Sequence, residues 1–256
     1  MSFIRSIALA AGLLPLFSCA ATRAPLRIAA AADLRYALEE LIRGFRAQHG
    51  GVAIEPVYGS SGTFYSELLN HAPFDLFLSA DVTYPRKLAE QSMVMPGSEF
   101  TYAVGRIVLW TSRGSGIDVD RLHLEAVRAE VVRHVAIANP AHAPYGRAAV
   151  AALQSAGMYD AVKGKLVMGE NISQAFQLVQ SGAAEVGLVA LSLAMAPGMD
   201  AKGVYWEVPA DSYPPITQGG AILKWARQAD AARQFRTFLL SAEGRAILRR
   251  YGFSGE

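Results

Sequence analysis

The stretch Glu55–Leu69, EPVYGSSGTFYSELL, is typical of a β-strand that ends in a Gly-Ser-Ser-Gly turn and continues directly into a helix. Such a junction presents several backbone N–H groups and two hydroxyl groups at a helix N-terminus, where the helix dipole favours negative charge. The stretch contains no Lys or Arg. It therefore predicts a site that offers an anion neutral hydrogen-bond donors and no cation.

Other parts of the chain repeat this order of strand, short turn and helix. The apolar run PLRIAAAA, which starts at Pro25, precedes an apolar stripe at helical spacing that stops before Gly50 and Gly51. The stripe consists of Leu34, Ala37, Leu38, Leu41, Ile42 and Phe45. A helical pattern also follows four further apolar runs: FDLFLSA (74–80), VVRHVAIANP (131–140), KLVMGE (165–170) and VGLVAL (186–191). Repeated units of this kind predict an α/β protein with mostly parallel sheets flanked by helices.

Two extended segments indicate two lobes rather than one. They are YAVGRIVLWTS (102–112) and YPPITQGGAIL (213–223), and each is long enough to cross from one sheet to another. We expect lobe I to comprise residues 25–107 and 216–256, and lobe II to comprise residues 108–215. Two lobes joined by two crossing segments predict a cleft between them.

The first 24 residues differ from the rest of the chain and predict a signal peptide. Arg5 is followed by an apolar run from Ile7 to Phe17 and then by small residues, a pattern too short for a stable membrane span. We therefore expect an exported protein. Cys19, the only cysteine, ends the lipobox-like LFSC, so a lipid anchor at Cys19 competes with ordinary cleavage after Ala21 or Ala24. Either outcome excludes a disulfide within the chain.

The composition excludes several other classes of protein. A chain of 256 residues with 52% apolar residues can bury a sizeable core, and a formal net charge of +2 leaves no basic surplus for nucleic acid. The five histidines show no metal-ligand spacing. The chain also lacks G-x-S-x-G, P-loop and H-E-x-x-H motifs. We expect neither a cofactor, nor a cation site, nor an enzyme.

Small and polar residues concentrate at four predicted strand-to-helix junctions: 29–34, 58–63, 139–148 and 169–175. Ligands of open α/β sheets bind outside the carboxyl ends of the strands, so we expect the four junctions to converge on one cleft. A compact dianion that loses its water needs a hydrogen bond for each oxygen lone pair, and neutral dipoles supply these. A Lys or Arg would hold monoanions and organic acids almost as well. The junctions therefore favour a small symmetric oxyanion.

At these junctions the chain resembles the periplasmic molybdate-binding proteins, the solute receptors of molybdate and tungstate ABC importers. The resemblance covers nearly all of the chain after the signal segment. It is carried by AAAADLRYALEEL, GSSGTFYSEL, APFDLFLSAD, FTYAVGRIVLW, AIANPAHAPYGRAA, SGAAEVGLVAL and RRYGF. It implies a type II periplasmic binding protein fold, a tetrahedral metal oxyanion as ligand and an inner-membrane ABC permease as partner. We expect the receptor to be a monomer.

The resemblance also implies four ligand positions: Asp33, Ser61, Tyr145 and the backbone N–H of Ile172. Further candidates share the same turns, namely Ala32, Ser60, Gly146 and Asn171. Some members of the family use a tyrosine after the VGLV strand, which is replaced here by Ala190. We therefore expect Tyr145 to supply a phenol hydroxyl.

Asp33 departs from the family pattern, which has Ser, Thr or Asn at this position. A carboxylate about 4 Å from a dianion would cost on the order of several kcal/mol at an intermediate effective dielectric. We expect the carboxyl group either to turn away and cap its own helix, leaving its backbone N–H for the ligand, or to stay protonated.

Two other interpretations of the anion site stay open. A receptor for sulfate, phosphate or an organic acid would use the same helix termini, and Arg147 would favour such a ligand if it pointed inward rather than into solvent. An enzyme for a phosphate-bearing substrate would need a general base, and Asp33 is the only carboxylate that we place at the cleft. We interpret Asp75 and Asp81 as structural, with Asp81 as a helix cap.

Overall fold

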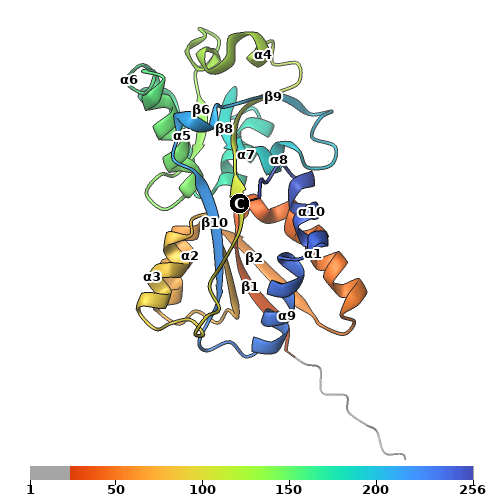
Figure 1. Ribbon diagram of the computed structural model, residues 1–256. Coiled ribbons are helices and arrows are strands. Elements are labelled where there is room, and N and C mark those ends of the chain that lie inside the picture. Colours follow the sequence, from red (N-terminus) through yellow and green to blue (C-terminus); the bar gives the residue numbers. More distant parts are fainter. Residues whose placement is uncertain (1–23, 256) are drawn as a thin grey trace, which may run out of the picture.

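The computed structural model describes residues 24–255 and has two lobes, each built on a five-stranded sheet (Figure 1). The lobe I sheet has the order β2-β1-β3-β10-β4, and consists of β1 (Leu26–Ala31), β2 (Ile54–Gly59), β3 (Leu76–Ser79), β4 (Phe100–Gly105) and β10 (Ile216–Ile222). The lobe II sheet has the order β7-β6-β8-β5-β9, and consists of β5 (Ile107–Ser112), β6 (Val135–Ala138), β7 (Leu166–Gly169), β8 (Val186–Ala190) and β9 (Gly203–Glu207). The predicted two-lobed α/β architecture is confirmed. The predicted signal peptide and Cys19 lie outside the described residues.

In each sheet four strands run in one direction and one strand runs against them, which confirms the prediction of mostly parallel sheets. The opposed strand is β10 in lobe I and β5 in lobe II. The chain enters each lobe from the other one along these strands, since β5 follows β4 after Arg106 alone and β10 follows β9 after residues 208–215. A strand that starts at the boundary between the lobes runs opposite to the strands that end there.

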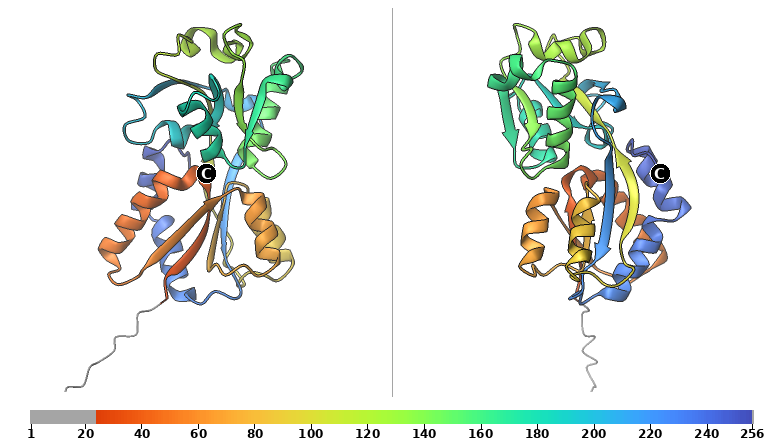
Figure 2. Two further views of the ribbon diagram at one scale, coloured as in Figure 1. Left: turned by 180° about the vertical axis from the view of Figure 1, so that it is seen from behind. Right: turned by 60° about the vertical axis from the view of Figure 1, so that its left-hand side comes forward.

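Helices cover both faces of the lobe I sheet (Figure 2). One face is covered by α1 (Arg35–Gln48), α9 (Ala229–Leu239) and α10 (Ala242–Arg250), and the other by α2 (Ser61–Leu69) and α3 (Thr83–Glu90). Lobe II carries α4 (Val119–Leu122), α5 (Pro144–Ser155), α6 (Tyr159–Val162), α7 (Ile172–Gln180) and α8 (Leu191–Ala194). The remaining short elements are the 3₁₀ turns η1 (Ala32–Leu34), η2 (His123–Arg128), η3 (Lys163–Lys165) and η4 (Ala210–Ser212).

The apolar pattern of the sequence explains how these layers pack in lobe I. Alternate residues of β1 face opposite sides of the sheet, so that Ile28 and Ala30 pack toward α1 whereas Ala29 packs toward α2. Helix α1 buries the predicted stripe of Ala37, Leu38, Leu41, Ile42 and Phe45. Burial of each large apolar side chain contributes about 1.5 to 3 kcal/mol, so this face holds α1 against the strands that lead to the boundary between the lobes.

The two crossing segments lie against each other at this boundary. The hydroxyl of Tyr213 accepts a hydrogen bond from the backbone N–H of Ile107, with an N–O distance of 3.3 Å. Both crossings therefore meet beside the carboxyl ends of the strands. No helix within residues 24–255 combines the length and the hydropathy of a membrane span.

Candidate functional site

The four predicted junctions meet where the two lobes face each other. Three hydrogen bonds join the junctions of lobe I to those of lobe II: Gly62 N to His142 O (2.9 Å), Ser173 Oγ to Ala32 O (2.9 Å) and Tyr145 Oη to Asp33 Oδ2 (2.9 Å). The prediction that the junctions converge is confirmed by these contacts. The lobes are thus closed on each other in this structure.

Two of the candidate residues act as caps that leave helix N-termini facing the boundary. Ser60 precedes α2, and its Oγ accepts a hydrogen bond from Thr63 N at 3.3 Å. Asn171 precedes α7, and its Oδ1 accepts from Gln174 N at 3.1 Å. A cap satisfies one N–H group of the first turn and leaves the N–H groups before it available to a ligand. Ile172, whose N–H is one of these, is the first residue of α7 and is buried.

Ser61 is the first residue of α2, and its hydroxyl group has a defined orientation. The side chain is only 1% exposed, and Oγ lies 2.9 Å from the backbone nitrogen of Ala80. An amide N–H only donates, so Ser61 Oγ is the acceptor in this contact. The hydroxyl proton of Ser61 therefore remains free to be donated to an anion.

Tyr145 lies in the first turn of α5, which begins with Pro144 at a position where proline costs no hydrogen bond. Its hydroxyl donates to Asp33, so the phenol proton that we expected an anion to use is engaged within the protein. Burial and the nearby Asp33 carboxylate raise the pKa of Tyr145 well above its usual value. Gly146 serves packing, because a Cβ atom there would lie 2.1 Å from Ala138 O at the end of β6.

Asp33 is buried in η1 and does not cap a helix. The residue that precedes η1 is Ala31 and the one that precedes α1 is Leu34, and neither turn has a side-chain cap. The capping alternative was therefore wrong, because the carboxyl group turns toward partners that are distant in the sequence. Burial raises the pKa of Asp33 from 3.8 to about 6, and hydrogen bonds from Gln218 and Tyr145 oppose that rise.

Gln218 was not identified from the sequence, although it contacts both Asp33 and Tyr145. It is fully buried in β10, and its Nε2 donates to Asp33 Oδ2 and lies 3.2 Å from Tyr145 Oη. Ser192, also missed, donates from Oγ to Asp33 O at 2.7 Å. One signal for Gln218 was available: a single long polar side chain within the apolar strand ITQGGAI.

Arg147 does not point into the site, and its partly exposed side chain reaches across the boundary to lobe I. Its Nη2 lies 2.6 Å from Asp81 Oδ2 in lobe I, and its Nη1 lies 3.3 Å from the hydroxyl of Tyr84. The other carboxylate oxygen of Asp81 accepts hydrogen bonds from the backbone and hydroxyl of Thr83 at the start of α3. Asp81 is therefore structural, as predicted, and it also bridges the lobes. Its interpretation as a helix cap was wrong, because Val82 precedes α3 and this helix has no side-chain cap. Asp75 is structural too, since it accepts backbone N–H bonds from Arg27, Arg227 and Gln228.

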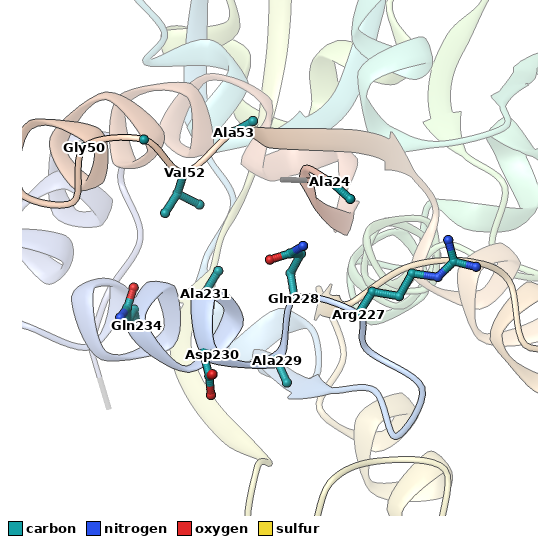
Figure 3. A pocket seen from close by; sticks show the side chains of 11 residues that line it. Ala24, Gly50, Val52, Ala53, Arg227, Gln228, Ala229, Asp230, Ala231 and Gln234 are labelled. Atoms are coloured by element: carbon teal, nitrogen blue, oxygen red, sulfur yellow. The ribbon is translucent and has the colours of Figure 1, made fainter. Parts of the chain in front are cut away.

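Of two surface hollows, one lies beside the site and the other lies away from it. A hollow of about 350 Å³ lies beside it between the lobes and is lined by Ala80, Asp81, Pro144, Arg147 and the segment 214–217, among others. Another of about 400 Å³ lies beside Ala24, at the amino end of β1 (Figure 3). Its lining comprises the turn 50–53, the segment 227–231 and Gln234. Neither hollow is lined by a predicted ligand residue.

The chemistry of the site is that of neutral donors. The residues that converge offer hydroxyl groups, amide groups and first-turn N–H groups beside the carboxyl group of Asp33, and the guanidinium of Arg147 is paired with Asp81. Within residues 24–255, no group of three or more His, Cys, Asp or Glu side chains is placed to hold a metal ion. Such an arrangement suits an anion whose charge is spread over several oxygens.

Comparisons with known proteins agree with this chemistry. The family model described as "Bacterial extracellular solute-binding protein" matches residues 26–254. The chain is 39% identical to "Molybdate-binding protein ModA" of Azotobacter vinelandii over 256 residues, which cover 99% of both chains. It is 41% identical to the protein of that name from Rhodobacter capsulatus over 206 residues, 80% of this chain and 79% of the relative. The solved structure of the A. vinelandii periplasmic molybdate-binding protein superposes with a TM-score of 0.84 at 34% identity, covering 90% of this chain and 99% of that one.

Proposed function

The chain belongs to the bacterial extracellular solute-binding proteins, and we propose that it is a receptor that binds molybdate or tungstate between its two lobes. It delivers the oxyanion to an ABC permease of the inner membrane, works as a monomer and catalyses no reaction. The names of its relatives in A. vinelandii and R. capsulatus support this ligand. The receptor acts in the periplasm, where it is either released by signal cleavage or anchored through Cys19.

One observation carries the proposal: the helix N-termini of both lobes meet at a point toward which no cation of residues 24–255 is directed. The N-termini of α2, α5 and α7 and the turn η1 are joined by hydrogen bonds across the boundary. Arg147, the cation that stands in the third junction, is engaged by Asp81 instead. A site of this kind binds through dipoles, which favours a compact dianion over an organic acid.

We assign the hydrogen bonds to the anion as follows. The hydroxyl of Ser61 donates one bond, because Ala80 N–H occupies an acceptor position of Oγ and leaves the hydroxyl proton unused. The first-turn N–H groups of Asp33, Tyr145 and Ile172 donate the others, since such groups have no partner within their helices. Ser60, Gly146 and Asn171 shape the turns that aim these donors, and Ala32 holds the lobes together through Ser173.

Asp33 is compatible with an anion when its carboxyl group carries a proton. A pKa of about 6 means that protonation near neutral pH requires little free energy. A dianion at the site raises this pKa further, because like charges disfavour ionisation. Binding of the oxyanion therefore favours the neutral acid.

The lobes that close on the ligand are residues 25–107 with 216–256, and residues 108–215. The hinge movements take place near residues 102–112 and 213–223, where both crossings meet. Because donors come from both lobes, the ligand stabilises the closed arrangement.

Titration calorimetry with a panel of molybdate, tungstate, sulfate and phosphate tests the proposal. We expect one-to-one binding of molybdate and tungstate and far weaker binding of the other two. Tight binding of sulfate or phosphate with weak binding of molybdate would replace the proposed ligand.

A further inference from the structure

Gln218 joins the lobes and a crossing strand at one buried point. Asp33 belongs to lobe I, Tyr145 to lobe II, and Gln218 to β10, the strand by which the chain returns to lobe I. Tyr145 Oη donates to Asp33 Oδ2 at 2.9 Å, and Gln218 Nε2 donates to the same oxygen and lies 3.2 Å from Tyr145 Oη. We call these three side chains the carboxyl cluster.

The side chains of the carboxyl cluster hold Asp33 through one oxygen only, and the backbone N–H groups of Asp33 and Leu34 also oppose the rise of its pKa. Both hydrogen bonds go to Oδ2, and Oδ1 has no hydrogen-bond partner among the described residues. No ion pair of Asp33 occurs within residues 24–255 either. The titratable groups beside it are the phenols of Tyr145 and Tyr102, whose pKa values its charge raises. Neutral donors alone therefore offset the charge of Asp33.

The backbone is shaped to admit this cluster. A Cβ atom at Gly105, the last residue of β4, would lie 2.1 Å from Tyr145 Oη and 2.9 Å from Gln218 Nε2. The register between β10 and β4 shifts at Gln218 and Gly219, and such an irregularity redirects a side chain out of the regular alternation. The amide of Gln218 can therefore lie against the carboxyl group, because Gly105 has no side chain and the strand register shifts at Gln218.

We propose that Gln218 is a positioning residue of the anion site, which holds the Asp33 carboxyl group on the side of the crossing strands and so leaves the main-chain N–H of Asp33 to the anion. This inference rests on the proposed function. An unheld carboxylate would be free to rotate toward the bound dianion, where like charges repel. The amide is suited to this task because it donates without adding a cation that would relax selectivity.

The test compares molybdate affinity in Gln218→Met, which keeps the length of the side chain and removes the donor, with the affinity of the wild-type protein and of Asp33→Asn. We expect Gln218→Met to weaken binding at least tenfold at pH 8. In the Asp33→Asn background the same substitution should cost less than threefold, because no carboxylate remains to be held. The loss should also shrink at pH 5, where the carboxyl group is mostly protonated. Gln234→Met, an exposed glutamine on α9, is the matched control and should leave the affinity unchanged.

A merely structural role of Gln218 predicts the same loss in both backgrounds and at both pH values, and that result would overturn the inference. So would wild-type affinity in Gln218→Met. If this variant fails to fold, Gln218→Asn provides the second test, because it keeps an amide but draws it back from the carboxyl group by one methylene. The variant should weaken binding, and Asp33→Asn should suppress this loss in the same way. Equal loss in both backgrounds would again overturn the inference.

If the wild-type protein binds another anion of the panel instead of molybdate, the proposed ligand is wrong. The same set of variants, measured with that anion, still tests Gln218. Binding of no anion would overturn both.

Discussion

Arg147 of lobe II and Asp81 of lobe I form an ion pair across the boundary between the lobes, with 2.6 Å between Nη2 and Oδ2. The pair lies at the rim of the site, where the Arg147 side chain is 41% exposed. Solvent therefore screens it, and such pairs contribute at most about 1 kcal/mol. Its position matters more than its strength, because it joins the two lobes across their boundary.

Arg147→Ala should speed the release of molybdate by up to roughly fivefold, since a contact of about 1 kcal/mol between the two lobes is lost. Stopped-flow measurement of the dissociation rate at low salt gives the effect, and salt should diminish it. Arg233→Ala removes an ion pair with Asp230 that lies within one helix and is the control. An unchanged rate in Arg147→Ala would remove the pair from closure.

Ser61→Ala should weaken molybdate binding by about 1.5 to 3 kcal/mol, because a neutral donor to a desolvated charge is lost. The fold should survive, with a modest loss of stability because Ala80 N–H loses its acceptor. Calorimetry measures the affinity and thermal unfolding measures the stability.

Ser60→Ala is the matched control for Ser61. It removes the cap of α2 and should lower the free energy of unfolding by about 1 kcal/mol with a smaller effect on affinity. Wild-type affinity in Ser61→Ala would exclude Ser61 from the site.

The stability of the ligand-free protein should depend on pH through Asp33. The folded state raises the pKa of this group from 3.8 to about 6, so the folded state binds the proton more tightly than the unfolded state. Its contribution to stability is fully present below pH 3.8 and is lost as the pH rises through 6, in total on the order of 3 kcal/mol. Urea unfolding from pH 4 to pH 8 should show this loss in the wild-type protein and a flatter profile in Asp33→Asn. Parallel profiles of the two proteins would contradict the burial of an unpaired carboxyl group.

Asp33→Asn should keep or strengthen molybdate binding, since it removes a negative charge from the site and retains a polar side chain that Gln218 and Tyr145 can contact. Affinity measured from pH 5 to pH 8 should fall with rising pH for the wild-type protein and stay level for the variant. A collapse of binding in the variant would mean that the carboxyl group itself contacts the ligand.

The fold could be predicted because short sequence patterns determine its helices and strands. The apolar stripe of α1 and each strand followed by its helix can be recognised within a short stretch of sequence. The long extended segments 102–112 and 213–223 predicted the two crossings between the lobes. The convergence of the four junctions followed from the rule that parallel strands end at one edge of a sheet.

The interior of the site could not be predicted in the same way. Asp33 contacts Tyr145 and Gln218, which lie 112 and 185 residues away along the chain. The periodicity of apolar residues predicts local structure and carries no information on such distant contacts. The orientation of the Ser61 hydroxyl depends on Ala80, and the direction of the Arg147 side chain depends on Asp81 in the other lobe. The ligand roles of Asp33, Ser61, Tyr145 and Ile172 stay predictions.

The site should select among dianions by size, because donors from both closed lobes fix the distances between them. Molybdate and tungstate have nearly the same size and charge, so they should bind alike. Sulfate is smaller, and it would leave some desolvated donors without a partner.

Thermal unfolding with each anion at equal micromolar concentration tests the central claim, that neutral donors of both lobes enclose a molybdate-sized dianion. Ligand at a hundredfold excess over its dissociation constant adds about 2.7 kcal/mol to the stability of the folded state. For a chain of this length each kcal/mol raises the Tm by roughly 2 to 4 °C. We predict increases of several degrees with molybdate and with tungstate and almost none with sulfate. Equal increases with sulfate, or no increase with either metal oxyanion, would contradict the account.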